Sequence, residues 1–124
     1  MDGSRTPVYE KLEMYIDGKW CQGSDGKSED VINPATEQVL GKLPHASKAD
    51  LDRALQAAQK GFDIWRKTTA YERAKVIRKA VDLIRQRADA IATTLTMEEG
   101  KPLGEAKLEV GVTADIIEWY AEEG

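Results

Sequence analysis

The sequence predicts a mixed α and β fold that is mostly helical, with two small N-terminal β-hairpins followed by three amphipathic helices. Three observations favour this fold class. Turn-forming residues divide short strand-like runs over residues 14–44. Helix-start signals then occur at Ser47 and Thr69. From there to the last residue, apolar side chains recur at steps of three and four, which is the period of one helix face.

The first hairpin is predicted from the pair Asp17-Gly18, which separates the apolar run 14–16 from residues 19–22. An Asp-Gly pair favours a two-residue turn, because both central residues of that turn need positive φ. A second hairpin is predicted from strand-like runs at residues 30–32 and 39–44. Pro34 interrupts these runs, since proline lacks a backbone N–H and biases the residue before it towards an extended conformation.

The first helix is predicted to begin at Ser47 and to end near Arg66. Ser47 followed by Asp50 matches an N-cap pattern, in which the hydroxyl accepts a free backbone amide. Apolar side chains then fall on one face: Leu51, Ala54, Leu55, Ala58, Phe62 and Trp65. We expect the two aromatic residues of this face, Phe62 and Trp65, to anchor the core.

The second helix is predicted from a capping box formed by Thr69 and Glu72. A continuous apolar seam follows, made of Ala74, Ile77, Val81, Ile84, Ala88, Ile91 and Leu95. The residues leave two alternatives open for the end of this helix. The helix either runs to Met97, or breaks near Arg87-Ala88, because a long helix often bends where it crosses a neighbour.

A short junction, Glu98 to Pro102, joins the second helix to a third that starts near Leu103 or Glu105. Gly100 favours a left-handed helix end, and Pro102 suits the first turn of a new helix. One face of the third helix is predicted to carry Ala106, Val110, Thr113, Ile117 and Tyr120. A flank carries Leu108, Val112, Ile116 and Trp119. We expect Gly111 to allow close approach by another backbone.

A helix that is apolar on nearly all sides requires more than one covering neighbour. Two hairpins and two other helices cannot supply that cover, so the sequence is expected to come from a larger structure. Residues 1–13 are predicted to be a flexible leader, and residues 14–124 to be one incomplete part of a domain.

Composition excludes several classes of function. Hydrophobic residues make up 41% and charged residues 32%, which is typical of a soluble globular chain. The formal net charge of −4 argues against a nucleic-acid partner. No apolar run is long enough for a membrane span, and no signal peptide precedes the strands, so a cytoplasmic protein without membrane partners is expected. One cysteine cannot form an intramolecular disulfide.

The single cysteine and the single histidine are the obvious candidates for catalysis, and neither has the setting that catalysis needs. An activated thiol requires a helix N-terminus, a cation or a base nearby. Cys21 lies in a predicted strand, and His45 lies in a loop far along the sequence. We therefore interpret Cys21 as structural and His45 as solvated. Neither Gly-x-Gly-x-x-Gly nor Gly-Lys-Ser/Thr occurs, so no phosphate loop is predicted.

Four motifs in order carry a resemblance to a known family. They are Met14 to Trp20, Val31 to Thr36, Glu98 to Leu103, and Ile117 to Gly124. This order resembles the N-terminal part of the NAD(P)-dependent aldehyde dehydrogenase family, from about Tyr15 to the last residue. The last two motifs are most similar to the succinate-semialdehyde dehydrogenase branch.

The resemblance implies a parent enzyme that oxidises an aldehyde, such as succinate semialdehyde or a similar semialdehyde, to the acid with NAD or NADP. In that family the nucleophilic cysteine, the general base, the oxyanion-hole asparagine and the nucleotide-binding units all lie downstream. We therefore expect no catalytic and no cofactor-binding residue in this chain, and Cys21 matches none of them. The implied partner is the remainder of the dehydrogenase chain or another subunit.

The resemblance also implies a monovalent cation site. The family's main-chain carbonyl ligands match Val31 and Ile32, and its carboxylate ligand matches Glu98, where aspartate is commoner. The alternative to an enzyme fragment is a free-standing helical interaction module, whose exposed third helix would bind a protein partner.

Overall fold

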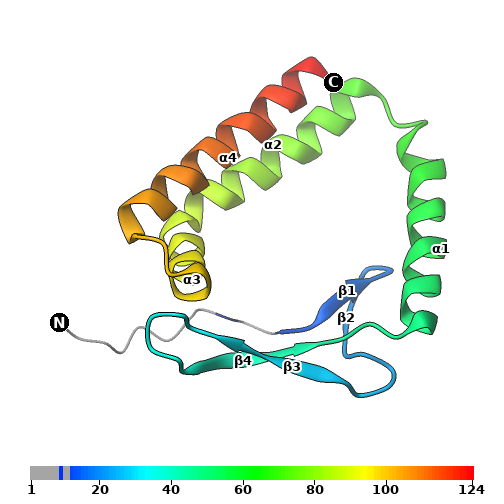
Figure 1. Ribbon diagram of the computed structural model, residues 1–124. Helices are drawn as coiled ribbons and strands as arrows, with labels where there is room; N and C mark the ends of the chain where they lie inside the picture. Colours follow the sequence, from blue (N-terminus) through cyan, green and yellow to red (C-terminus); the bar gives the residue numbers. More distant parts are fainter. Residues whose placement is uncertain (1–8, 10–11) are drawn as a thin grey trace.

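The computed structural model describes residue 9 and residues 12–124. The described chain runs through four strands and then four helices (Figure 1). The strands are β1 (Met14–Ile16), β2 (Lys19–Cys21), β3 (Ser28–Ile32) and β4 (Val39–Pro44). The helices are α1 (Lys48–Trp65), α2 (Ala70–Gln86), α3 (Ala88–Glu99) and α4 (Leu103–Glu123). Most of the predicted leader, residues 1–8 and 10–11, lies outside the described residues.

Both predicted hairpins are confirmed as two-stranded antiparallel sheets, β1-β2 and β3-β4. In the first, Met14 pairs with Cys21, and the turn residues Asp17 and Gly18 have φ of 52° and 76°. These positive values are the reason why an Asp-Gly pair is favoured there. The rings of Tyr15 and Trp20 pack against each other with their centroids 5.0 Å apart.

The second hairpin turns at Asn33, which is buried. The Asn33 side-chain oxygen accepts a hydrogen bond from the Ala35 N–H at 2.9 Å, and its main-chain carbonyl accepts from the Glu37 N–H at 2.8 Å. An asparagine whose side-chain oxygen accepts from the backbone N–H two residues later stabilises a turn. The register shifts between Val31 and Ile32, which marks an irregularity just before this turn.

Asp50 joins α1 to the loop that precedes β3. The Ser47–Asp50 capping box is confirmed, and the Asp50 carboxylate is fully buried. It accepts hydrogen bonds from the backbone N–H groups of Ser24 and Ser47, each at 2.9 Å, and from the guanidinium of Arg53 at 2.6 Å. These backbone donors hold the pKa of Asp50 well below its usual range, because they favour the charged carboxylate.

The predicted second helix is in fact two helices, so the described residues form four helices and not three. The capping box of Thr69 and Glu72 is confirmed at the start of α2. Arg87, with φ −102° and ψ 10°, ends α2 and begins α3. Of the two alternatives left open, the break near Arg87 is therefore the correct one. The break allows both α2 and α3 to pack against α4.

The apolar core lies entirely where α2, α3 and α4 meet. The buried aliphatic residues of the described chain are Val81, Ala92, Ala106, Val110, Ala114 and Ala121. Most of them are alanines, and small side chains allow helix axes to approach closely. Figure 1 shows α2 and α4 side by side, with α3 at one end of the pair.

Several sequence expectations about packing are wrong. Phe62 and Trp65 are 57% and 40% exposed, because α1 stands apart from the other helices (Figure 1). Tyr120 is predicted to share a helix face with Ala106 and Val110, which are buried, but it is 63% exposed, and Ala121 is buried beside it in the sequence. Among the described residues, no atom from outside its own helix lies within 4 Å of the position that a Cβ of Gly111 would occupy, so none of their backbone approaches it closely.

None of the helices in the described part of the chain is long and apolar enough to cross a bilayer.

Candidate functional site

The corner between α3 and α4 lies against the turn of the second hairpin. Gly100 ends α3 in the left-handed conformation, with φ 75°, as predicted. A Cβ at Gly100 would lie 3.1 Å from Cγ of Pro34, a tight contact that adds to the preference for glycine set by the positive φ. This contact brings the end of α3 close to the chain that follows Val31 and Ile32.

Glu98 occupies the last turn of α3 and accepts a hydrogen bond from the hydroxyl of Tyr9. Burial raises the pKa of the Tyr9 hydroxyl, and the hydrogen bond and the charge of Glu98 raise it further. The tyrosine therefore stays protonated and donates. Because Tyr9 and Glu98 are 89 residues apart, this contact ties the start of the described chain to α3.

The electrostatic environment of this corner favours a cation. Glu98 and Glu99 sit at the C-terminus of α3, where the helix dipole is negative, and the last turn of α3 contains no basic residue. Lys101 is the nearest cation along the chain, but its ammonium pairs with Glu99 at 3.5 Å and also with Glu109. The hydrogen bond to Glu109 is the main reason why the pKa of Lys101 is raised.

The ligands predicted from the sequence would suit a monovalent cation better than a transition metal. Two neutral main-chain carbonyls and one carboxylate are hard oxygen donors with a single negative charge. No group of three histidine, cysteine, aspartate or glutamate side chains could hold a metal within residue 9 and residues 12–124.

The other candidate residues lie away from this corner. Cys21 is half-buried at the end of β2 and lines a pocket beside α1. The imidazole of His45 lies 3.4 Å from the carboxylate of Glu29, on the second hairpin. Sequence reasoning missed the contact between Tyr9 and Glu98. No local sequence pattern predicts this contact, because the two residues are far apart in the sequence.

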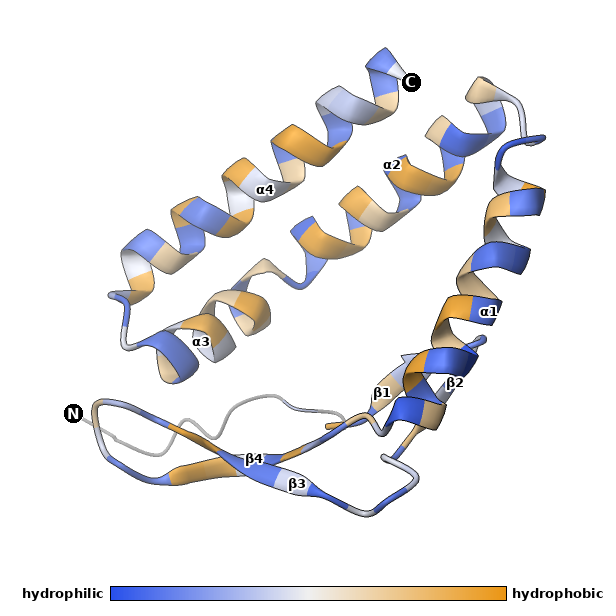
Figure 2. Cartoon of the chain, turned by 45° about the vertical axis from the view of Figure 1, so that its right-hand side comes forward, coloured by the Kyte–Doolittle hydropathy of each residue, from blue (hydrophilic) through white to orange (hydrophobic). Residues whose placement is uncertain are grey.

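A second feature of functional interest is the exposed apolar flank of α4. As predicted, Leu108, Val112, Ile116 and Trp119 are all exposed. In Figure 2, apolar residues recur along both α2 and α4, including positions that no other element of the described chain covers. A large exposed apolar patch marks an interaction surface.

The comparisons with known proteins place this architecture in one family. Residues 20–124 match the model of the aldehyde dehydrogenase family. The chain is 37% identical over 123 residues to a succinate semialdehyde dehydrogenase of Acinetobacter baylyi, covering 99% of this chain and 25% of that protein. It is 40% identical over 113 residues to a glutarate-semialdehyde dehydrogenase of Pseudomonas aeruginosa, covering 91% and 23%.

A solved structure gives the same result for the fold. The crystal structure of succinate-semialdehyde dehydrogenase from Burkholderia pseudomallei matches with a TM-score of 0.88 and 42% identity, over 91% of this chain and 23% of that chain. The chain thus spans about a quarter of the length of the curated relatives it matches. With the family model covering residues 20–124, the chain belongs to the aldehyde dehydrogenase family.

Proposed function

We propose that this chain is the N-terminal part of an enzyme that oxidises a semialdehyde, with succinate semialdehyde as the first candidate, to its acid with NAD or NADP. The observation that carries the proposal is the 37% identity over 123 residues to a succinate semialdehyde dehydrogenase, of which the chain covers 25%. The exposed apolar flank of α4 supports a docking role within such an enzyme. The role of these residues is to dock the remainder of the dehydrogenase, or another subunit, and to support its catalytic part.

The exposed apolar residues of α4 support this docking role. Leu108, Val112, Ile116 and Trp119 are 69%, 47%, 50% and 57% exposed. They recur at steps of three and four, so they lie on one side of the helix. An apolar side of a helix that no described residue covers is consistent with a structure completed by further protein.

The described residues do not fit a dinucleotide cofactor. Both of their sheets are two-stranded and antiparallel, whereas a dinucleotide site is built on parallel βαβ units with a glycine-rich turn. We therefore assign NAD(P), which accepts a hydride in such an oxidation, to the remainder of the enzyme. No step of the reaction is assigned to residues of this chain.

The first experiment tests catalysis directly. The 124-residue chain is assayed with succinate semialdehyde and with NAD or NADP, following NADH or NADPH absorbance. No turnover above background is expected, because the described residues contain no parallel βαβ unit that could hold the dinucleotide that accepts the hydride. Turnover that vanishes in Cys21→Ala would contradict the proposal and make Cys21 a nucleophile.

The second experiment tests docking in a longer polypeptide that carries this segment. Trp119→Glu introduces a charge on the apolar flank of α4, and should strongly reduce soluble, active enzyme. Thr113→Glu introduces the same charge at an exposed polar position of the same helix and serves as the matched control. Equal activity of the two variants would exclude the flank as a docking surface.

The alternative, a free-standing interaction module, is favoured by the same exposed flank. Reading the coding DNA beyond Gly124 separates the two functions at once. In the isolated chain the flank should bind a hydrophobic dye such as ANS, and Trp119→Glu should reduce that fluorescence. An assembled enzyme should lose the dye signal, because its own polypeptide then covers the flank.

We also propose that the carbonyls of Val31 and Ile32 and the carboxylate of Glu98 hold a monovalent cation. The negative end of α3 and the closeness of Gly100 to Pro34 support this site. Sodium or potassium should raise the melting temperature more than tetramethylammonium at equal ionic strength, since a bound ion stabilises the folded state. Glu98→Gln should remove the difference and Glu99→Gln should keep it. Identical responses of the two variants would disprove the assignment.

A further inference from the structure

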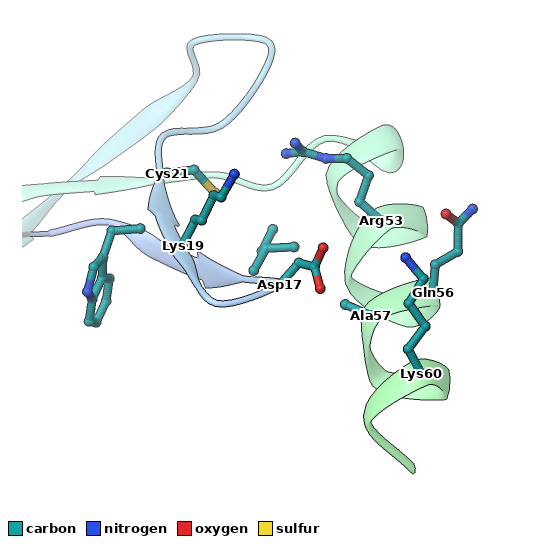
Figure 3. A pocket seen from close by; sticks show the side chains of 9 residues that line it. Asp17, Lys19, Cys21, Arg53, Gln56, Ala57 and Lys60 are labelled. Atoms are coloured by element: carbon teal, nitrogen blue, oxygen red, sulfur yellow. The ribbon is translucent and has the colours of Figure 1, made fainter. Parts of the chain in front are cut away.

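A pocket of about 310 Å³ lies between the first hairpin and α1. Figure 3 shows its lining from close by. Lys19 and Cys21 come from the hairpin side, and Arg53, Gln56 and Lys60 come from α1. Its size is at the lower end of the range for small-molecule sites.

Both walls of the pocket are held in place. The Asp17-Gly18 turn and the pairing of Ile16 with Lys19 fix the hairpin wall. On the other wall, Arg53, Gln56 and Lys60 are spaced three and four residues apart, so they share one helix face. The buried carboxylate of Asp50 accepts a 2.6 Å hydrogen bond from Arg53, which orients the guanidinium.

The charge of the pocket is opposite to that of the chain. The chain carries a net charge of −4, yet three cations line this pocket. The nearby carboxylates are that of Asp17 in the lining and that of Asp50, which pairs with Arg53, so the pocket keeps an excess of positive charge. Lys19 and Lys60 form no ion pair with any residue of the described chain, namely residue 9 and residues 12–124. Grouped like charges repel each other, and a bound anion would relieve that repulsion.

The donors in the pocket define the class of ligand. Lysine and arginine side chains are hydrogen-bond donors only, and the Gln56 amide adds two more donors. Arg53 uses one donor on Asp50 and retains others of its five. A ligand that satisfies such a set must offer several acceptor oxygens and negative charge, as phosphate groups and carboxylates do.

We propose that this pocket binds a small multivalent oxyanion, held by Lys19, Arg53 and Lys60. The ligand carries at least two charged oxygen groups, because the cations come from opposite walls. Pyrophosphate represents the phosphate source of this chemistry, and succinate represents the carboxylate source. The proposal is independent of aldehyde oxidation, since it assigns no step of that reaction to a residue of the pocket.

The test uses Cys21 as a reporter. It is the only cysteine of the chain and lines the pocket, so its alkylation by iodoacetamide can be followed without ambiguity. Pyrophosphate or succinate should slow that alkylation at least about fivefold, while sodium chloride at equal ionic strength should not. Calorimetric titration of the same two ligands measures the affinity directly.

Matched lysine variants locate the site. Lys60→Gln and Lys19→Gln should each weaken binding about tenfold, which corresponds to about 1.4 kcal/mol, and should abolish the protection of Cys21. Lys75→Gln removes the same charge from the exposed surface of α2, and should leave both the affinity for the anion and the protection of Cys21 unchanged. Protection by pyrophosphate alone assigns the site to phosphates, and protection by succinate alone assigns it to carboxylates.

Three results would overturn the proposal. The first is that neither anion binds or protects Cys21 at millimolar concentration. The second is that sodium chloride protects as well as either ligand. The third is that Lys60→Gln and Lys75→Gln respond alike. None of these results bears on the aldehyde assay, so failure here is distinguishable from failure of the proposed enzyme function.

Discussion

The helical unit formed by α2, α3 and α4 and the region formed by the hairpins and α1 are held together in different ways. In the helical unit the buried residues are aliphatic, including Ala92, Ala106 and Val110. In the hairpin and α1 region the buried residues with polar side chains are Asn33 and Asp50, and large apolar residues such as Phe62 are exposed.

The difference shows which region has its own core. Burial of apolar surface is the main favourable term in folding, so the helical unit carries most of the stability of the described chain. The hairpin and α1 region is positioned by turns, caps and one buried carboxylate, and its apolar residues are free to pack on further protein. A segment of a larger enzyme is expected to show this division, because its other faces are completed elsewhere.

The largest expected effect comes from placing a charge in the core of the helical unit. Val110→Asp should reduce the free energy of unfolding by about 3 kcal/mol or more, because the new carboxylate is buried without a partner. Val112 lies two residues along the same helix and is 47% exposed, so Val112→Asp should cost about 0.5 kcal/mol. Urea denaturation of the two variants measures the difference, and similar losses would contradict the assignment of Val110 to the core.

A second prediction concerns the polar anchoring of α1 by Asp50. The pKa of Asp50 is lowered in the folded state, whereas an unfolded aspartate has a pKa of about 3.9. Its contribution to stability is therefore present above about pH 5 and is lost as the pH falls through about 4 towards the folded pKa. Asp50→Asn should flatten the dependence of the melting temperature on pH in this window.

Asp52→Asn is the control for that measurement. Asp52 is exposed and pairs with Lys48 on the surface of the same helix, at 3.2 Å. This variant should keep the wild-type response to acid. If both variants respond like the wild type, the anchoring of α1 does not depend on the Asp50 carboxylate.

The smallest effect is expected from the ion pairs that link α2 to α4. Arg78 and Glu122 lie 2.6 Å apart, and both side chains are about half exposed. A double-mutant cycle with Arg78→Met and Glu122→Gln should give a coupling energy of about 0.2–1 kcal/mol. The coupling should fall in high salt, because screening weakens exposed pairs. A coupling that does not change with salt would show that this pair is shielded from solvent.

The features that could be predicted from the sequence are those set by local chemistry. The Asp17-Gly18 turn, the caps at Ser47 and Thr69, and the helix end at Gly100 each depend on residues within a few positions of one another. The structure confirms all four. The exposed flank of α4 was also predictable, because one helix cannot bury apolar residues on all sides in so small a chain.

The features that could not be predicted depend on tertiary packing. Phe62 and Trp65 have the periodicity of a core face, but periodicity does not say whether a partner is present. A break near Arg87 was one of two alternatives that the sequence left open, and the choice between them depends on how α2 and α3 pack against α4. Of the predicted cation ligands, Glu98 lies at the corner expected, and the ligation itself stays a prediction.

The contact between Tyr9 and Glu98 has a consequence for the order of events in folding. Closing a loop of this size, 89 residues, costs about 4 kcal/mol in chain entropy. One exposed hydrogen bond contributes only about 1 kcal/mol, so it cannot close that loop by itself. The contact must form late, after the hairpins and helices have brought the two ends together. Tyr9→Phe should therefore leave the folding rate unchanged and act on unfolding alone.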